Sequence, residues 1–521
     1  MGTEQTASKQ AGISSFLSLI RQKYLVPTLL VFLLGITVRC NLVYPEHKYE
    51  ADSDAVLGPL CGEQVLAGSR PIFFPGGYRL SAQTCYVEAA AIAVLGHTKV
   101  AVGIPGLVFG IFFLVFFYLY LRAAHGPFAA VIALPLAAVP PIQLILNTYV
   151  PWAYGEILMW CAAALWLGAL AAKANSKWWI WICLGFTIGV ATWSSVQSLM
   201  VTLPVCVYVL LGNRRGLLSH IGQILAGLFV GLLPVLYFIL TRGLTPFANN
   251  RGFGTNGAAQ AILNLLSFLK TNVPLLLVGA PFASLTPTSW FHFACYALLG
   301  IGIPITLLNI KSPGWRDAVL ATGIALTCVF LFSVSSAAAI GGWNVRYVLP
   351  LYFVFPIAVA IASNLVERNH WIYPISLVVA VVLLNLKAYP LTGTQYRNSL
   401  VRAAAQDERL IGWLQQRGVA AVVGNYWNVH FLSYYSNRSV VGVPTSEAND
   451  YFAFGVEAAK SHRRWALLAG DMDSLFRWKQ SLGLTGEYAR FSPNLHVFVP
   501  DSIGNDSMVF LKRARTQAAG L

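Results

Sequence analysis

Charged residues are scarce in this chain, and acidic residues are the scarcer kind. Only 11% of the 521 residues are charged, with 20 acidic residues against 35 basic ones. Hydrophobic residues make up 57%, and the mean hydropathy is +0.63. A chain this apolar and this poor in charge does not fit the ordinary soluble class. The composition therefore predicts a membrane protein.

A basic stripe or an aromatic-interleaved basic patch is also missing. The lysines and arginines are scattered along the chain, whereas nucleic-acid ligands need such a patch. We therefore expect no nucleic-acid partner, and we assign the positive charge to short cytoplasmic loops. The exception is "LKRART" at 511–516, in a basic tail over 506–521, which fits a solvated or lipid-facing terminus.

Cysteines are few and show no zinc-type spacing. Five of the eight fall in or beside apolar runs, where cysteine behaves as a small hydrophobic residue. Cys61 and Cys85 share the first non-membrane loop. They would pair if that loop lies in an oxidising compartment, and two free buried thiols are the alternative.

Apolar windows of about 20 residues, the length that crosses a bilayer as a helix, recur from residue 24 to residue 388. The sequence predicts an α-helical polytopic membrane protein with about 11 transmembrane helices. The predicted spans are 24–44, 99–121, 127–146, 154–172, 177–193, 196–212, 218–240, 290–310, 318–337, 347–366 and 371–388.

Alternate loops between these spans are basic, which identifies the cytoplasmic side. The residues that mark it are Arg21, Lys23, Arg122, Lys173, Lys177, Arg214, Arg215, Lys311, Arg316 and Arg368. The N-terminus is then cytoplasmic. The loops 45–98 and 241–289 and everything after residue 389 are external, with an interfacial amphipathic helix expected at 258–269.

Helical and strand-like patterns alternate from residue 399 to residue 500, which predicts a small external α/β domain over 389–505. The transmembrane module is then 1–388, including the loop 45–98. Expected strands are "VAAVVGN", "SVVGVP", "RWALLAG" and "LHVFVP", with helices "LVRAAAQDERLIGWLQQRG" and "DMDSLFRWKQSLG".

Three of the few acidic residues gather in "YEADSDAVLG", just after the first apolar run. In an extended segment, Asp52 and Asp54 point to one side and suit a divalent cation or a shared proton. At a helix N-terminus, Asp54 would instead act as a cap. The sequence leaves both possibilities open. Asp317, on the cytoplasmic side, is expected to be a solvated partner of Arg316.

The order of motifs around this cluster resembles a known family. "DSDAVLGPLCGEQVLAGSRPIFFPGGYRLSAQTCYVEAAAIAVLG" at 52–96, with "VPWAYGEIL", "GVATWSSVQSL" and "WNVRYVLPLY" further on, is similar to bacterial GT-C superfamily glycosyltransferases. These include enzymes like dolichyl-phosphate-mannose protein mannosyltransferase and aminoarabinose transferase. The resemblance implies the GT-C fold, a polyprenyl-phosphate-sugar donor and a multi-pass protein of the bacterial inner membrane.

The resemblance also implies roles for individual residues in an inverting transfer. Asp54 is the expected general base, with Asp52 as the alternative, and the two are tentative ligands of Mg or Mn. The donor phosphate is expected to be bound by arginines, whose fork pairs with phosphate oxygens. These are Arg346, Arg79 and Arg39.

Five further residues are expected to bind substrate. Glu88 and Glu156 would bind acceptor hydroxyls or a metal, or pair with those arginines. Tyr154, Tyr347 and Trp193 would contact the sugar, although aromatic residues also gather at membrane interfaces.

The acceptor is expected to be a lipid, glycan or protein, and membrane lipids surround the spans. The main alternative is a transporter or flippase, which would place ionisable residues inside spans and use repeated broken helices. A polymerase or ligase of lipid-linked glycans and a structural scaffold are further alternatives.

Overall fold

The computed structural model of the chain describes fourteen segments. They are 23–40, 53–75, 80–149, 154–244, 257–309, 311–312, 314–335, 342–365, 371–425, 429–445, 464–469, 472–481, 483–492 and 495–501. The chain divides into two compact units, which are described separately. Unit 1 comprises 1–41, 107–147 and 154–389, and unit 2 comprises 42–106, 148–153 and 390–521.

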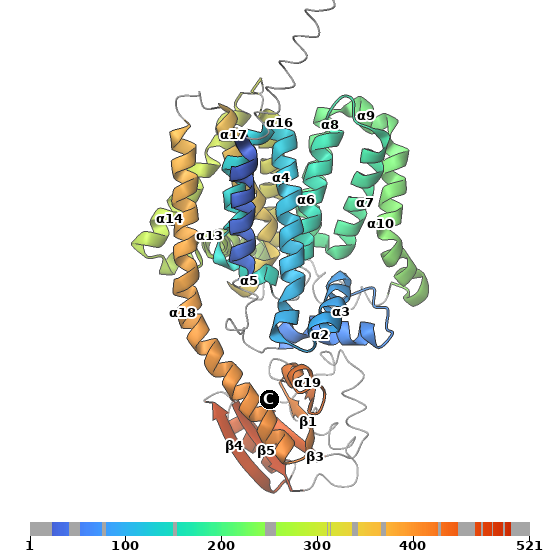
Figure 1. Ribbon diagram of the computed structural model, residues 1–521, viewed down its shortest axis with the longest axis vertical. Helices are drawn as coiled ribbons and strands as arrows, with labels where there is room; N and C mark the ends of the chain where they lie inside the picture. Colours follow the sequence, from blue (N-terminus) through green and yellow to red (C-terminus); the bar gives the residue numbers. More distant parts are fainter. Residues whose placement is uncertain are drawn as a thin grey trace, which may run out of the picture. The chain divides into compact units, whose positions relative to one another are not determined.

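Unit 1 is helical (Figure 1). It contains a helix at Lys23–Cys40 and then α4 (Lys99–Ala138), α5 (Ile142–Tyr149), α6 (Tyr154–Ala171), α7 (Trp178–Ser194), η1 (Val196–Ser198), α8 (Leu199–Gly212), α9 (Arg214–Ser219), α10 (Ile221–Arg242), α12 (Ala258–Ser267), η2 (Phe268–Asn272), α13 (Val273–Val278), η3 (Phe282–Ser284), α14 (Pro287–Gly300), α15 (Gly302–Leu307), α16 (Trp315–Val334), η5 (Gly342–Tyr347), η6 (Leu349–Phe353), α17 (Val354–Leu365) and α18 (Ile372–Gln416). Residues 99–106 of α4, 148–149 of α5 and 390–416 of α18 belong to unit 2.

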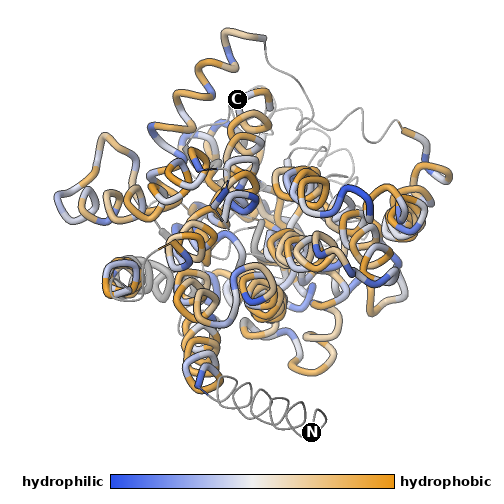
Figure 2. Tube along the Cα trace, turned by 90° about the horizontal axis from the view of Figure 1, so that it is seen from above, coloured by the Kyte–Doolittle hydropathy of each residue, from blue (hydrophilic) through white to orange (hydrophobic). Residues whose placement is uncertain are grey.

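Eight helices among the described residues are long and apolar enough to cross a membrane. Viewed from above, hydrophobic residues predominate along the helices (Figure 2). The shorter apolar helices at Trp178–Ser194, Val196–Gly212 and Leu349–Leu365 coincide with three predicted spans. The polytopic helical fold class is confirmed.

Two features differ from the expected spans. Predicted spans 99–121 and 127–146 run together as α4, which breaks at Gly126, where φ is 86° and ψ is 171°. Such a φ favours glycine because it lacks a Cβ atom. The segment Ala258–Val278, expected as an interfacial helix in an external loop, is also long and apolar enough to span.

Asp317 is buried, with 5% of its surface exposed, so the expectation of a solvated residue is wrong. The Tyr120 hydroxyl donates to Asp317 Oδ1 at 3.2 Å, and His125 Nε2 lies 3.4 Å from the same oxygen. A loop position next to Arg316 gives no sign of this, because the partners lie about 190 residues earlier in α4.

Helices α7 and α10 pack backbone to backbone through glycines. Each carries two glycines four positions apart, Gly185 and Gly189 on α7 and Gly227 and Gly231 on α10. A Cβ atom on Gly189 would lie 2.7 Å from the Leu228 carbonyl oxygen, and one on Gly227 would collide with the Ile182 carbonyl oxygen. This is the small-residue packing that lets helices approach closely in membranes.

Unit 2 begins with a helical hairpin, α2 (Ser53–Leu66) and α3 (Gln83–Leu95). Cys61 and Cys85 are joined by a disulfide bond across it. Gly62 of α2 packs directly on Glu88 of α3, where an added Cβ atom would lie 2.9 Å from the Glu88 Cβ atom. The core side of α2 is formed by Val56, Leu57 and Leu60, which have no exposed surface.

The C-terminal part of unit 2 is a five-stranded mixed sheet in the order β2-β1-β3-β5-β4. Its elements are β1 (Val419–Gly424), α19 (His430–Tyr435), β2 (Val441–Pro444), β3 (Arg464–Ala469), α21 (Met472–Ser481), β4 (Gly486–Ser492) and β5 (Leu495–Pro500). Strand β1 pairs in parallel with β2 and β3, and β5 pairs antiparallel with β3 and β4. A small C-terminal α/β domain is confirmed.

Two details of this domain were not expected. Strand β4 was not predicted. Its sequence "GEYARFS" has one strongly apolar residue and two charged ones, as an exposed edge strand allows. The predicted helix near 400 is the end of α18, which continues without a break from the last apolar window (Figure 1).

Candidate functional site

The predicted acidic cluster falls at the start of α2. Asp54 lies in the first turn of this helix, whereas Asp52 and Arg79 lie outside the described residues. An acidic residue in the first turn complements the positive end of the helix dipole. The structure thus places the backbone of Asp54 at a helix N-terminus, where the sequence allowed a strand or a helix.

Glu88 lies in α3 and is fully buried. Neither of its carboxylate oxygens has a hydrogen-bond partner among the residues that the structure describes. Burial penalises the charged form and raises the pKa of Glu88 well above its usual value. A carboxyl group with a pKa raised in this way favours the neutral form, which is able to donate a hydrogen bond.

Four predicted residues of unit 1 lie on two elements, α6 and η5. Tyr154 and Glu156 share the first turn of α6, and both are buried. The ring of Tyr154 meets the ring of Tyr347 edge to face, with centroids 6.4 Å apart. The half-buried Arg346 holds its guanidinium carbon 5.4 Å from the centre of the Tyr347 ring.

Trp193 lies one residue before the end of α7 and is half-buried. Of the predicted residues in unit 1, Tyr154 and Tyr347 are in direct ring contact. Arg346 contacts the ring of Tyr347.

Arg39, predicted to bind phosphate, is engaged by backbone carbonyl groups. Its guanidinium donates to the carbonyl oxygens of Gly35, Ala137 and Ala138, each at 3.1 Å. Gly110 leaves room for it, since an added Cβ atom would lie 2.8 Å from Arg39 Nε. The positive side chain therefore lies at the C-terminal, negative end of the α4 dipole.

The carbonyl groups bound by Arg39 belong to a run of five, Leu136 to Pro140, at the end of α4. Pro140 and Pro141 have no N–H group, so the carbonyls of Leu136 and Ala137 lose their ordinary helical partners. Side chains from other helices replace them. Tyr352 donates to Leu136, Arg39 to Ala137 and Ala138, Asn385 to Val139 and Tyr389 to Pro140.

We refer to Arg39, Tyr352, Asn385 and Tyr389 as the carbonyl collar. Unsatisfied carbonyl groups are costly away from water, so the collar stabilises the break between α4 and α5. Sequence reasoning missed three of its four members. The adjacent prolines inside an apolar run were the available signal.

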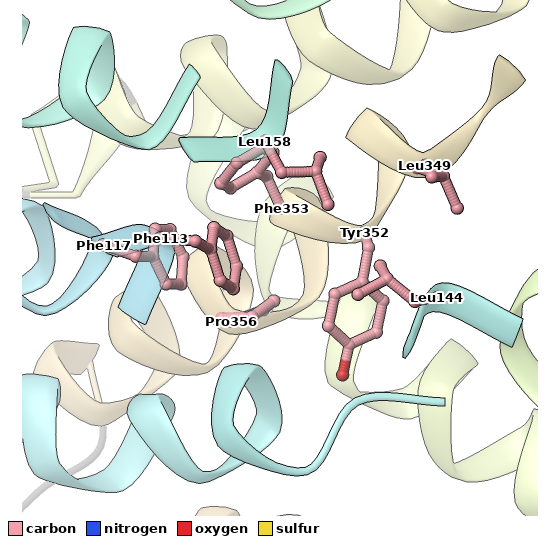
Figure 3. A pocket seen from close by; sticks show the side chains of 8 residues that line it. All are labelled: Phe113, Phe117, Leu144, Leu158, Leu349, Tyr352, Phe353 and Pro356. Carbon is pink, nitrogen blue, oxygen red and sulfur yellow. The ribbon is translucent and has the colours of Figure 1, made fainter. Parts of the chain in front are cut away.

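An apolar crevice, too narrow to hold a water molecule, lies beside the collar in unit 1. Phe113, Phe117 and Phe353 form an aromatic cluster along it (Figure 3). Tyr352 supplies the single polar side chain of the lining, and its hydroxyl is bound to the Leu136 carbonyl. The crevice has no charge with which to bind a phosphate.

A metal site is not found among the described residues, where no three His, Cys, Asp or Glu residues gather. The side chains of the two tentative ligands, Asp52 and Asp54, lie outside the described part of the chain. The divalent cation therefore stays a prediction.

Comparisons with known proteins agree with this architecture. Residues 84–239 match the family described as dolichyl-phosphate-mannose-protein mannosyltransferase. The structure resembles ArnT from Cupriavidus metallidurans bound to undecaprenyl phosphate, with a TM-score of 0.65, 12% identity and coverage of 92% of this chain and 98% of that one. The apo state of that protein gives the same score and identity, with 94% and 98% coverage.

A weaker likeness links the chain to the oligosaccharyltransferase of Archaeoglobus fulgidus tethered to an acceptor peptide. The TM-score is 0.51, the identity is 11%, and 92% of this chain and 74% of that one are covered. No curated protein sequence matches the chain. The chain has the GT-C fold, and the resemblance to GT-C superfamily glycosyltransferases that its motifs predict is confirmed.

Proposed function

We propose that the chain is an integral-membrane glycosyltransferase that moves a sugar from a polyprenyl-phosphate donor to an acceptor on the external face of the membrane. The observation that carries this proposal is the GT-C fold over more than nine-tenths of the chain, shared with a protein solved with undecaprenyl phosphate bound. The mannosyltransferase family match over 84–239 supports it independently.

The similar structures also suggest the chemical classes of the donor and the acceptor. The similar structures were solved with a polyprenyl phosphate in one case and an acceptor peptide in another. For this chain we propose a polyprenyl-phosphate sugar as the donor, carrying a hexose or a pentose, and a lipid, glycan or protein as the acceptor.

In the proposed reaction, Asp54 is the general base, with Asp52 as the alternative. The carboxylate accepts the proton of the acceptor hydroxyl as its oxygen attacks the anomeric carbon of the sugar. The bond from that carbon to the phosphate oxygen breaks, and the polyprenyl phosphate leaves. Attack from the face opposite the phosphate inverts the anomeric configuration.

Arginines are proposed to stabilise the departing phosphate. Arg346 is the best supported, because it is half-buried and adjoins the aromatic contact between Tyr154 and Tyr347. Arg79 keeps its predicted role. For Arg39, the bonds to the α4 carbonyl groups support a structural role instead.

The proposed orientation places the N-terminus in the cytoplasm and unit 2 on the external side of a bacterial inner membrane. The disulfide bond within α2 and α3 supports this, since disulfides persist in oxidising compartments.

The test is transfer of radiolabelled sugar from a panel of polyprenyl-phosphate donors to membrane lipids, glycans or proteins. Asp54→Asn is expected to lower the transfer rate by about 10²- to 10⁴-fold, the usual contribution of a general base. Asp52→Asn is assayed in parallel, and Asp473→Asn, an exposed position in α21, is the matched control. Equal transfer by all variants would exclude both aspartates as the base. No transfer by the wild type from any donor would favour a transporter.

A further inference from the structure

A cluster of ionisable groups around the buried carboxylate of Glu63 links the first helical hairpin to the C-terminal α/β domain inside unit 2. Glu63 of α2 accepts from Arg438, with Arg438 Nε 2.7 Å and Nη2 2.5 Å from Glu63 Oε2. The other carboxylate oxygen, Oε1, lies 3.0 Å from His97 Nε2. We call Glu63, His97 and Arg438 the Glu63 clamp.

The clamp joins segments 375 residues apart in sequence. Only 8% of the Glu63 side chain is exposed. A charge buried to this degree is stabilised only when it is paired. Because Arg438 binds one oxygen of Glu63 and the His97 ring lies beside the other, the position of α2 depends in part on the segment that carries Arg438.

The backbone at Arg438 is held in an unusual conformation. Asn437 has a φ of 49° and Arg438 a φ of 59°. Two consecutive residues other than glycine in the left-handed region are uncommon, and such strain persists only where the surroundings impose it. The turn is fixed by its own hydrogen bonds, with Arg438 N donating to Ser433 O at 2.8 Å. The strained turn directs the arginine toward α2.

Helix α19 carries the second contact of this interface. The ring of Tyr434 lies 5.7 Å from the ring of His97, centroid to centroid. Its hydroxyl donates to the Thr98 carbonyl oxygen at 3.4 Å. Tyr434 is buried, and burial raises the pKa of its hydroxyl, so that the phenol stays neutral beside Glu63 and Glu88.

Helix α2 needs this support. It is 14 residues long and contains Pro59, and an isolated helix of this length is marginal in water. Asp54 lies in its first turn and Glu63 in its last. The C-terminal domain therefore contacts, through Arg438, the helix that carries the proposed base.

We infer that Arg438 and Glu63 are positioning residues, through which the C-terminal domain fixes α2 and the acidic motif at its start. The mechanical half of this inference, that the clamp fixes α2, does not depend on the proposed function. The catalytic half, that fixing α2 supports sugar transfer, rests on the proposed function. Loss of the clamp is expected to loosen α2 and to slow the chemical step without weakening donor binding.

The experiment compares full-length wild type with Arg438→Ala, Arg438→Gly and Glu63→Gln by hydrogen–deuterium exchange of residues 53–66. We expect exchange in α2 to accelerate by about tenfold in all three variants, because one partner of a buried charged hydrogen bond is lost. Arg438→Gly also relieves the backbone strain, so it separates loss of the side chain from loss of strain. Arg417→Ala is the matched control, since it removes a second Arg–Glu pair of unit 2, with Glu487.

The same preparations are assayed with the donor panel. We expect kcat to fall by about tenfold while the donor KM stays within about twofold, the pattern of an interaction needed in the transition state. Unchanged exchange in Arg438→Ala would overturn the clamp itself. Faster exchange with unchanged kcat would overturn the positioning role. If the wild type transfers no sugar, the proposed function fails, and the exchange data decide the mechanical half alone.

Discussion

Glu88 shows how one buried carboxyl group makes stability depend on pH. Its pKa is raised by burial, so the folded protein retains a proton that the unfolded chain releases near pH 4.5. The contribution of Glu88 to the free energy of unfolding is fully present below the pKa of Glu88 in the unfolded chain. It is lost as pH rises toward the higher pKa of Glu88 in the folded protein. Wild type should lose about 1.4 kcal/mol per pH unit over this window.

We expect Glu88→Gln to abolish this dependence, because the amide does not titrate. Thermal unfolding of unit 2 between pH 5 and pH 8 measures the slope. Glu487→Gln is the control, since the pKa of Glu487 is lowered by the hydrogen bonds from Arg417 and its effect is confined to acidic pH. An unchanged slope in Glu88→Gln would mean that the carboxyl group is not held protonated.

At the scale of single residues, the sequence was a better guide to which ionisable residues matter than to their hydrogen-bond partners. Glu88 and Glu156 were noticed because acidic residues are rare in the chain, and both are buried. Arg39 was noticed for its charge, but its partners are backbone carbonyl groups of its own helix and of α4, and the one of Ala137 lacks its ordinary helical partner because Pro141 has no N–H group. Backbone acceptors carry no sequence signature of their own, so the structure was needed to find them.

Among the helices, the contact of α7 with α10 depends on the absence of side chains. An added methyl group at Gly227 meets the backbone of α7, whereas one at Gly222, on the same helix, has nothing within 4 Å. Helix α10 is otherwise largely exposed, with 11% of its most apolar window buried. Its position therefore depends mainly on α7.

We expect Gly227→Ala to destabilise the fold by about 1–3 kcal/mol, the usual range for overpacking. Gly222→Ala should be neutral or slightly stabilising, because alanine has the higher helix propensity. Unfolding in mixed detergent micelles gives both values. Equal stabilities for the two variants would contradict close packing of α7 against α10.

Hydrophobic length and charge predicted the apolar elements well. All eleven predicted windows fall on helices that the structure describes, and four predicted strands of the C-terminal domain are present. The element that was missed, β4, pairs only with β5 and lacks a hydrophobic run. The continuation of α18 through residue 390 was not predicted either, since a change of composition is not a break in the backbone.

For the molecule as a whole, the disulfide bond between Cys61 and Cys85 offers a test of the proposed external location of the α2–α3 hairpin. It closes a loop of 24 residues, and closing such a loop stabilises a fold by about 3 kcal/mol. We expect both thiols to resist maleimide in cells until a reductant is added. Asp473→Cys, at an exposed position of α21, supplies the control thiol that needs no reductant. Labelling of Cys61 without reductant would contradict an oxidised, external hairpin.

The division into units was less accessible from sequence. The loop 45–98 was grouped with the transmembrane module because it lies between two spans. The structure groups it with the C-terminal region, through contacts such as Glu63 with Arg438. Residues so distant along the chain leave no periodic pattern that a single sequence reveals.

The carbonyl collar has a consequence for biosynthesis. Arg39 and its acceptors Ala137 and Ala138 are made early, but the donors to Val139 and Pro140 lie on α18, the last apolar helix of the chain. A nascent chain that stops before residue 372 leaves the carbonyl groups of Val139 and Pro140, just after α4, without these donors. The hydrogen bonding at the α4–α5 break is therefore completed only after α18 has been synthesised, and a product truncated before α18 would lack both donors.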